Sequence, residues 1–151
     1  MNTVSKLFED PNASRLESVL AELVKTLNHR RQAVLNRFQV NELEVEIIRF
    51  LDGEDERKMK EIGSFFNIKL STLTSTIDKL ERNKLVRRKN SKEDRRVIYI
   101  RPTPKGQNLL DELRANIRSV SETAIQTAKA PEFDGLIKGL ELMLDLAKKN
   151  G

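Results

Sequence analysis

Cysteine is absent from the 151-residue sequence, and histidine occurs only once, at His29. Without cysteine the protein can form no disulfide, no thiolate metal site and no thiol sensor of oxidants. A single histidine cannot supply the cluster of imidazole ligands that a histidine-rich metal site needs. We therefore expect neither a metal ion nor a cofactor.

Long apolar runs are equally scarce in this sequence. No stretch approaches the roughly 18 apolar residues that would cross a membrane. Residues 1–12 also lack the basic start and the apolar stretch of a signal peptide. We therefore expect a cytoplasmic protein with no membrane partner.

Aromatic residues make up only 5% of the sequence, and tryptophan is absent. Charged residues make up 34%, a composition that suits long solvated helices better than a β-sandwich or a barrel. A chain of this length is typical of one domain with one sizeable core. We expect a single, mainly helical domain over residues 1–151.

Catalytic motifs are missing as well. The sequence contains no nucleophile elbow, no phosphate-binding loop and no paired set of histidine and carboxylate residues. The hypothesis that the protein is an enzyme therefore has little support, and we expect no catalytic residues.

Positive charge, by contrast, is concentrated in one block. Residues 82–106 include ten lysines and arginines but only two acidic residues, Glu93 and Asp94. The net charge of the whole chain is +5, so the remainder of the chain is mildly acidic. Such a distribution is typical of proteins that bind polyanions, although a solvated charged hairpin would show the same pattern.

Apolar residues recur at helical spacing over most of the chain. The pattern predicts helices over residues 11–36, from Asn41 to the polar stretch 52–56, over 58–66, 70–83 and 104–129, and from Pro131 onward. Asn41 with Glu44 matches a capping box, and Asn67 can end a helix in the left-handed conformation. The residues expected on buried faces include Leu43, Phe65, Phe66 and Leu70.

A short β-hairpin follows the two short helices. Residues 85–89 and 97–100 have the composition of strands, and the polar stretch 90–96 between them is turn-like. Thr103 and Pro104 then supply a helix cap and a proline at the first helical position. Two short helices followed by a hairpin form a winged helix-turn-helix, which we place at residues 41–103.

Three local motifs stand out: the helix end and first strand at residues 80–88, the wing tip at 93–96 and the next helix start at 103–106. Together they resemble the MarR family, the multiple-antibiotic-resistance regulators. Their order and spacing agree with the family, and the order of the helices extends the resemblance over nearly the whole chain. The family usually has glycine where Lys84 stands, so we expect Asn83 to take the left-handed conformation. We also expect Ser71 to cap the helix that begins at Lys69.

The resemblance implies a transcription regulator that binds double-stranded DNA as a homodimer, and it favours a repressor. The long terminal helices carry more apolar surface than the small winged helix-turn-helix can cover. We therefore assign dimerisation to residues 11–36 and 104–149. Two-fold protein symmetry then predicts an inverted-repeat DNA site. Many family members release DNA when a small effector, often an aromatic anion, binds to them.

Candidate DNA-binding residues lie on the second short helix and on the hairpin. One face of that helix carries small hydroxyls, which let a helix sit deep in a major groove. The candidates on the helix are Ser71, Thr72, Ser75, Lys79 and Arg82, and those on the hairpin are Arg88, Arg95 and Arg96. An ordinary amphipathic surface helix would show the same face. DNA binding is therefore favoured only because a wing follows this helix.

Asp94 is the candidate support of the wing tip, through an ion pair with Arg88 or Arg96. Arg95 or Arg96 could then enter a narrow minor groove, where negative potential is concentrated. The family signature favours Arg96 as the paired residue and Arg95 as the freer one. The alternative hypothesis is a winged-helix module that binds another protein and no DNA, and the block of positive charge counts against it.

Overall fold

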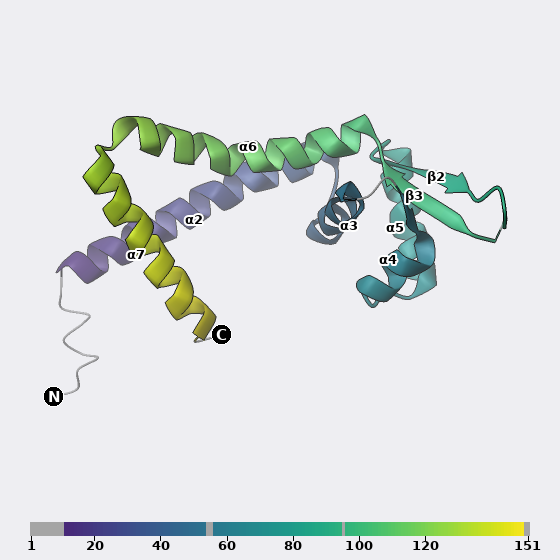
Figure 1. The fold of residues 1–151 in the computed structure, drawn as a ribbon, viewed down its shortest axis with the longest axis horizontal. Coiled ribbons are helices and arrows are strands. Elements are labelled where there is room, and N and C mark those ends of the chain that lie inside the picture. Colours follow the sequence, from purple (N-terminus) through teal and green to yellow (C-terminus); the bar gives the residue numbers. More distant parts are fainter. Residues whose placement is uncertain (1–10, 54–55, 95, 150–151) are drawn as a thin grey trace. The chain divides into compact units, whose positions relative to one another are not determined.

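The computed structural model describes residues 11–53, 56–94 and 96–149 (Figure 1). The chain divides into two compact units, one extending to Arg114 and the other beginning at Ala115. Helices dominate both units, and a small antiparallel sheet lies in the first. The predicted fold class, mainly α with a small β-hairpin wing, is confirmed.

The helices begin and end within one or two residues of the predicted positions. The elements are α2 (Pro11–Phe38), α3 (Glu42–Asp52), β1 (Arg57–Lys58), α4 (Met59–Phe65), α5 (Leu70–Arg82), β2 (Val86–Asn90), β3 (Ile98–Pro102), α6 (Pro104–Thr127) and α7 (Ala130–Lys149). The loop between β2 and β3 projects beyond the neighbouring helices α4 and α5 (Figure 1).

The sheet has three antiparallel strands in the order β1-β3-β2. Its register places Arg87 opposite Arg101 and Lys89 opposite Tyr99. Strand β1 is missing from the sequence prediction because two residues are too few to show an alternating pattern. This strand joins the segment after α3 to the wing, so the wing is better supported than a free hairpin would be.

The core of the first unit lies between the end of α2, the helices α3 to α5, the sheet and the start of α6. Its fully buried large side chains are Leu35, Ile47, Ile48, Leu51, Ile62, Leu73, Ile77, Leu80, Leu85, Ile100, Leu109 and Leu110. Each such side chain contributes about 1.5–3 kcal/mol through removal of apolar surface from water, before the opposing entropy cost. This core fixes α5 and the hairpin relative to each other.

Three residues expected on buried faces are exposed instead. Leu43 is 39% exposed, Phe65 66% and Leu70 64%. Leu43 and Leu70 lie in the first turns of α3 and α5, where the core does not reach them. Phe65 stacks on Phe50 at the surface, with ring centroids 4.1 Å apart, whereas Phe66 is half-buried and packs against the core.

The predicted capping box of α3 is confirmed. The side chain of Asn41 accepts a hydrogen bond from the Glu44 amide, and the Glu44 carboxylate accepts one from the Asn41 amide, both at 2.9 Å. Asn67 also has the expected left-handed backbone, with φ of 51°. At these two positions the capping-box and helix-end rules predicted the local structure correctly.

The end of α5 differs from the prediction. Asn83 has an ordinary right-handed backbone with φ of −77°, and Lys84 itself takes the left-handed conformation with φ of 61°. The Lys84 amide donates to Glu81 O and the Leu85 amide to Leu80 O, both at 2.9 Å. These two bonds form a Schellman motif, whose geometry requires the left-handed residue one position later than we expected.

Surface ion pairs join α2 to its neighbours in the first unit. The Arg31 guanidinium donates to the Glu42 carboxylate at the start of α3, with Nε 2.9 Å from Oε1. This hydrogen bond lowers the pKa of Glu42 below its ordinary value. The stabilisation is therefore present at neutral pH and is lost on acidification, as Glu42 becomes protonated. Arg37 of α2 likewise pairs with Glu112 of α6.

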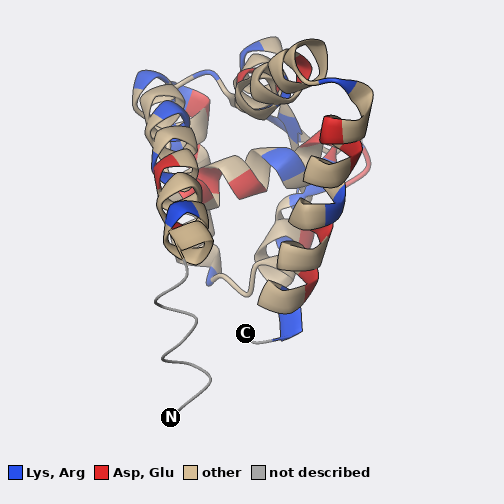
Figure 2. Cartoon of the chain, turned by 90° about the vertical axis from the view of Figure 1, so that its left-hand side faces the viewer, with Lys and Arg blue, Asp and Glu red and all other residues tan. Residues whose placement is uncertain are grey.

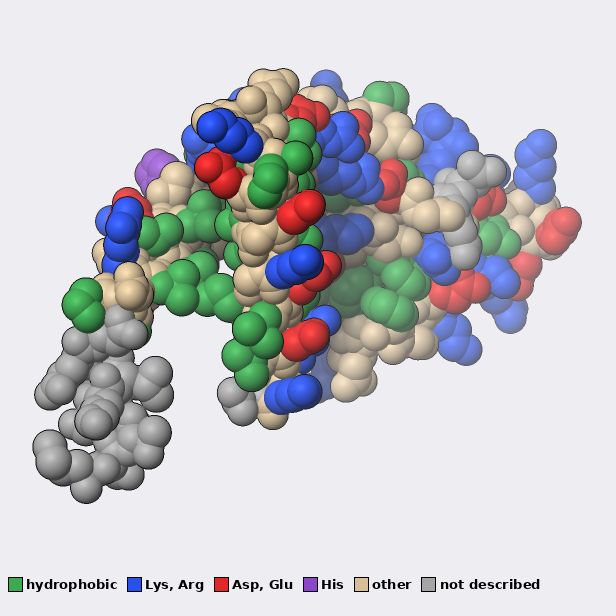
Figure 3. Space-filling model, turned by 60° about the vertical axis from the view of Figure 1, so that its left-hand side comes forward, with side chains coloured by type: hydrophobic (Ala, Val, Ile, Leu, Met, Phe, Trp, Pro, Cys, Tyr) green, Lys and Arg blue, Asp and Glu red, His purple; other side chains and the backbone are tan. Residues whose placement is uncertain are grey.

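The second unit consists of the later part of α6 and of α7. No described residue of α7 is buried within the single chain. The exposed apolar residues of this unit are Ile117, Val120, Ile125, Leu136, Ile137, Leu140, Leu142, Leu144 and Leu146. Figure 3 shows hydrophobic side chains at the surface of α7, and Figure 2 shows charged positions interspersed along it. None of the described helices is long and apolar enough to cross a membrane.

Candidate nucleic-acid interface

Helix α5 has two opposite faces. Leu73, Ile77 and Leu80 are completely buried on the inner one. The predicted contact residues of this helix that are exposed are Ser71, Thr72, Ser75 and Arg82. The sequence prediction thus placed Ser71, Ser75 and Arg82 opposite the apolar face, with Thr72 to one side, and all four are exposed. We refer to these four residues as the polar strip.

The hydroxyl groups of this strip are small and partly fixed by the helix itself. Ser75 Oγ donates to the Thr72 carbonyl oxygen at 2.8 Å. This bond uses the hydroxyl proton and leaves the oxygen lone pairs free to accept a bond from a donor on a base edge. The N-cap of α5 is Lys69, which makes no side-chain cap bond, and the structure gives Ser71 no capping role.

Lys79 lies beside the strip but has a partner within the chain. Its Nζ is 2.8 Å from Oε2 of Glu44, a carboxylate whose side chain is only 4% exposed. The side chain of Lys79 remains 41% exposed. Its ammonium group therefore compensates a buried negative charge and joins α5 to α3, a role that the sequence did not indicate.

Arg88 joins the first wing strand to α5. Its Nη1 donates to the Glu81 carboxylate at 2.7 Å, and its Nη2 lies 2.5 Å from Oδ1 of Asp78. The Arg88 backbone amide also donates to Glu81, at 3.1 Å. The sequence analysis missed both acidic partners, although two carboxylates three residues apart on one helix face are a recognisable signal. The side chain is only 24% exposed, and its main contact is with α5.

The wing tip is held by backbone hydrogen bonds around Asp94. Oδ1 of Asp94 accepts a bond from the Arg96 amide at 2.9 Å, and its carbonyl oxygen accepts one from the Val97 amide. Of the two expected partners of Asp94, Arg88 is bound to α5 instead, and Arg96 contacts Asp94 through its backbone amide. The side chain of Arg96 is exposed, whereas Arg95 lies outside the described residues.

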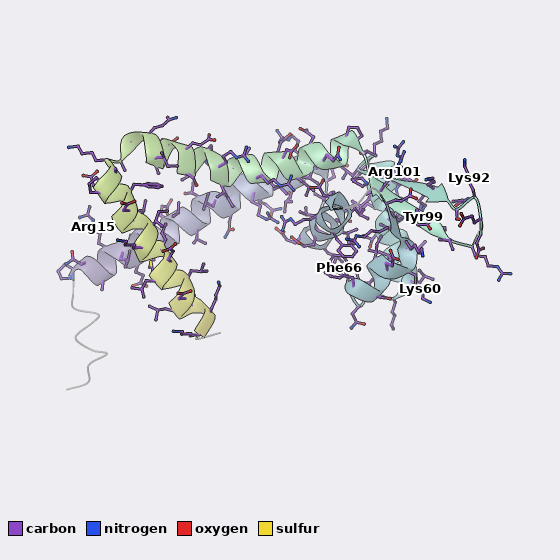
Figure 4. The ribbon with its side chains drawn as sticks, viewed as in Figure 1. Arg15, Lys60, Phe66, Lys92, Tyr99 and Arg101 are labelled. Atoms are coloured by element: carbon purple, nitrogen blue, oxygen red, sulfur yellow. The ribbon has the colours of Figure 1, made fainter. Side chains whose placement is uncertain are left out.

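The positive block of the sequence is partly neutralised in the fold. Arg88 pairs with two carboxylates, and Lys89 Nζ is 2.9 Å from the Glu56 carboxylate. Lys105 donates to the Asn83 carbonyl oxygen at the end of α5. The cations that remain for a partner are the exposed ones, among them Arg82, Lys92 at the wing tip (Figure 4) and Arg96.

A sequence profile of the MarR family matches residues 40–98, from the end of α2 to the first residue of β3. Over these residues the chain is similar to the MarR family. The matched segment contains α3, α4, α5 and β2, which are the elements that form the candidate interface.

Two relatives from Bacillus subtilis have similar sequences. The HTH-type transcriptional regulator MhqR is 27% identical over 99 residues, which cover 66% of this chain and 68% of MhqR. The uncharacterized HTH-type transcriptional regulator YkoM is 29% identical over 105 residues, covering 70% of this chain and 68% of YkoM.

Solved structures share the fold at lower sequence identity. The YusO protein from Bacillus subtilis superposes with a TM-score of 0.71 and 20% identity, over 97% of this chain and 99% of YusO. The DNA complex of MepR from S. aureus superposes with a TM-score of 0.67 and 16% identity, over 82% of this chain and 98% of MepR.

The MarR motif at 103–106 has a clear structural basis in this chain. Thr103 Oγ1 donates to the Lys84 carbonyl oxygen at 2.6 Å and accepts a bond from the Gly106 amide at 3.1 Å. A Cβ atom at Gly106 would lie 2.2 Å from the Leu85 carbonyl oxygen. Threonine and glycine are thus needed because α6 begins in close contact with the backbone at the start of the wing.

Proposed function

We propose that this protein is a MarR-family transcriptional regulator that binds double-stranded DNA sequence-specifically, with α5 in the major groove and the wing tip at the minor groove. The observation that supports this best is the connection that Arg88 makes between β2 and α5. It holds the polar strip of α5 and the hairpin in one body, so that both can meet the same duplex. MepR, which has the same fold, has been solved with DNA.

The proposed contacts follow from exposure and charge. Ser71, Thr72 and Ser75 would meet base edges, because they are short and lie on the exposed strip. Arg82 would bind phosphate, and Arg96 would lie at the minor groove together with Arg95. Lys79 and Arg88, the other two residues of the predicted set, would act mainly by positioning, since each is bound to carboxylates of the chain.

The deciding experiment combines DNA selection with variants of the wing. Fragments selected from random duplex DNA by the wild type would be bound at least tenfold more weakly by an Arg95→Ala, Arg96→Ala double variant. That factor corresponds to about 1.4 kcal/mol. A Lys148→Ala, Lys149→Ala double variant removes two neighbouring cations from the end of α7 and serves as the matched control.

Thr72→Ala and Ser75→Ala test the contact of α5 with the bases. They should change which bases are preferred, whereas the affinity should not fall equally for all sequences.

Unchanged DNA affinity in a folded wing variant would contradict the proposed DNA contact of the wing. Failure of the wild type to select any duplex at about physiological salt would contradict the DNA function itself. In that case the alternative, a winged-helix module that binds another protein, would become the better hypothesis.

We further propose a homodimer that binds an inverted repeat and acts as a repressor. The support is the set of large apolar side chains on α2 and α7 that stay exposed in a single chain, since exposed apolar patches mark interaction surfaces. Half-sites would lie about one helical turn, or 10–10.5 bp, apart. Footprinting that shows a single half-site bound as tightly as the full site would contradict this arrangement.

Release of DNA by a small effector completes the proposal. A cavity of about 570 Å³ lies between α4, the start of α5 and the wing-tip end of β3, with a mainly apolar lining that includes three cations, Lys58, Lys60 and Arg96. An aromatic carboxylate would suit both features. We expect 2-hydroxybenzoate, but not acetate at equal ionic strength, to weaken DNA binding. Equal effects of the two anions would contradict an effector of this class.

A further inference from the structure

The outer face of the sheet brings two arginines together. Arg87 of β2 and Arg101 of β3 are directly opposite each other in the antiparallel register. Side chains in such positions have their Cβ atoms about 4.5–5.5 Å apart, and like charges there destabilise the pairing. Because side chains alternate along a strand, Arg87 lies on the face opposite to that of Arg88, which is bound to α5. The pair is therefore separate from the candidate DNA-binding strip.

Arg101 also has a hydrogen-bond donor without an acceptor. Its Nε atom is buried, and within residues 11–53, 56–94 and 96–149 no atom accepts its hydrogen bond. A buried donor left unsatisfied costs about 1–3 kcal/mol, and native proteins contain few of them. A donor of this kind, on a strand residue directly opposite a second arginine, can donate to an acceptor from outside the described residues.

A polar cavity of about 580 Å³ adjoins the two arginines, and its lining residues are Asp52, Gly53, Arg87, Arg101, Pro102, Pro104 and Gln107. Figure 4 shows Arg101 at the base of the hairpin, close to the start of α6. The side-chain amide of Gln107 can supply a further donor. The carboxylate of Asp52 is the one acidic group in this lining, and it is paired with Arg114 at 2.7 Å.

We propose that Arg87 and Arg101 form a binding site for a phosphate-type oxyanion. Guanidinium groups bind phosphate oxygens through two parallel hydrogen bonds, and Nε takes part in that fork. A doubly charged oxyanion between the two would remove their mutual repulsion and satisfy the buried Nε. Binding would also join the wing strands to the start of α6, the two elements that meet at the Thr103 motif. The proposal does not depend on the proposed function, since the site is tested first without DNA.

Thermal unfolding in phosphate tests the site directly. We expect inorganic phosphate at tens of millimolar to raise the Tm of the wild type by about 3 °C over chloride at equal ionic strength, as ligand linkage predicts for a millimolar site. Arg87→Gln and Arg101→Gln should each abolish this gain. In chloride, both variants should be at least as stable as the wild type, because the repulsion between the strands is gone. Arg15→Gln, near the start of α2, is the matched control and should keep the full gain.

A second measurement separates the two sources of such an oxyanion. If the ligand is a free phosphate group, the two arginine variants should bind selected DNA in chloride as well as the wild type does, within twofold. If the ligand is a phosphate of the DNA backbone, both variants should bind DNA more weakly, with a salt slope lower by about one unit. The proposal is overturned if Arg87→Gln and Arg101→Gln behave like Arg15→Gln both in the phosphate-induced Tm gain and in DNA binding.

Discussion

Glu44 is the one charged side chain that is buried in the part of the chain that the structure describes, at 3% exposure. Its carboxylate is satisfied by the Asn41 amide and by the ammonium group of Lys79. A lysine that already compensates a carboxylate releases few additional counterions when DNA binds. The role of Lys79 is thus better tested by stability than by affinity.

Replacement of Lys79 by alanine should therefore lower the free energy of unfolding by about 1–3 kcal/mol, because Glu44 is left buried without its cation. The salt slope of DNA binding should stay nearly unchanged. Urea unfolding and a salt titration of DNA affinity measure the two effects.

Arg82→Ala is the matched comparison, since Arg82 is an exposed cation near the end of the same helix. It should leave unfolding unchanged and lower the salt slope by about one unit. The reverse result, a stable Lys79 variant with a lower salt slope, would show that Lys79 contacts phosphate after all.

The junction between α5 and the wing depends on the backbone of one position. Lys84 adopts a left-handed conformation, which is unfavourable for a residue with a Cβ atom and natural for glycine. The Schellman hydrogen bonds that end α5 nevertheless require that conformation at Lys84.

We expect Lys84→Gly to raise the free energy of unfolding by about 0.5–1 kcal/mol, the difference between relief of strain and the added flexibility of the unfolded chain. Lys84→Ala removes the same charge but keeps the Cβ atom, so it should bring no gain. Chemical unfolding of both variants checks this, and an equal gain for alanine would attribute the effect to charge instead.

The junction between the wing and α6 depends on the missing side chain of Gly106. Since a Cβ atom would lie 2.2 Å from the Leu85 carbonyl oxygen, Gly106→Ala must push α6 away from the hairpin. We expect a loss of at least about 2 kcal/mol in the free energy of unfolding. At Gly139 of α7 no atom lies within 4 Å of an added Cβ, so Gly139→Ala is the control and should cost nothing. A Gly106→Ala variant as stable as wild type would mean that the close approach is not needed.

The exposed apolar residues of α7 bear on whether the protein is a monomer or a dimer. Ile137 and Leu140 are 39% and 43% exposed in the single chain, and with Leu136 and Leu144 they follow helical spacing along one face. Such a face is stable in water only when another surface covers it. We propose a second copy of the chain, because obligate dimers bury more than roughly 2,000 Å² of largely apolar surface.

Sedimentation velocity at micromolar concentration should accordingly give the mass of a dimer for the wild type. Leu140→Glu should shift it toward monomer or unfold it, and circular dichroism distinguishes the two outcomes. Lys138→Glu, on the opposite side of the helical wheel, is the control and should leave the dimer intact. A wild type that sediments as a stable folded monomer would refute the dimer.

The sequence alone was sufficient to predict the helices, their order, the capping box of α3, the left-handed Asn67 and the wing. It also placed Ser71, Ser75 and Arg82 on the exposed face of α5, with Thr72 beside them. These features depend on residues close together in the chain, where the periods of helix and strand and the preferences of caps apply directly. The family motifs lie in the same short range, and the match to the MarR family covers two of the three, at residues 80–88 and 93–96.

Only the tertiary structure decided which charges meet. Lys79 binds a carboxylate 35 residues away in the sequence. Arg88 of β2 binds Asp78 and Glu81 of α5, and no helix or strand period relates residues of two different elements. The two-residue strand β1 and the facing pair Arg87 and Arg101 also depend on strand pairing. Ion pairs and sheet register are properties of the folded arrangement, because they join residues whose distance in space is unrelated to their distance in sequence. For that reason the sequence located the basic block, whereas the fold determined which of its cations are free to bind a partner.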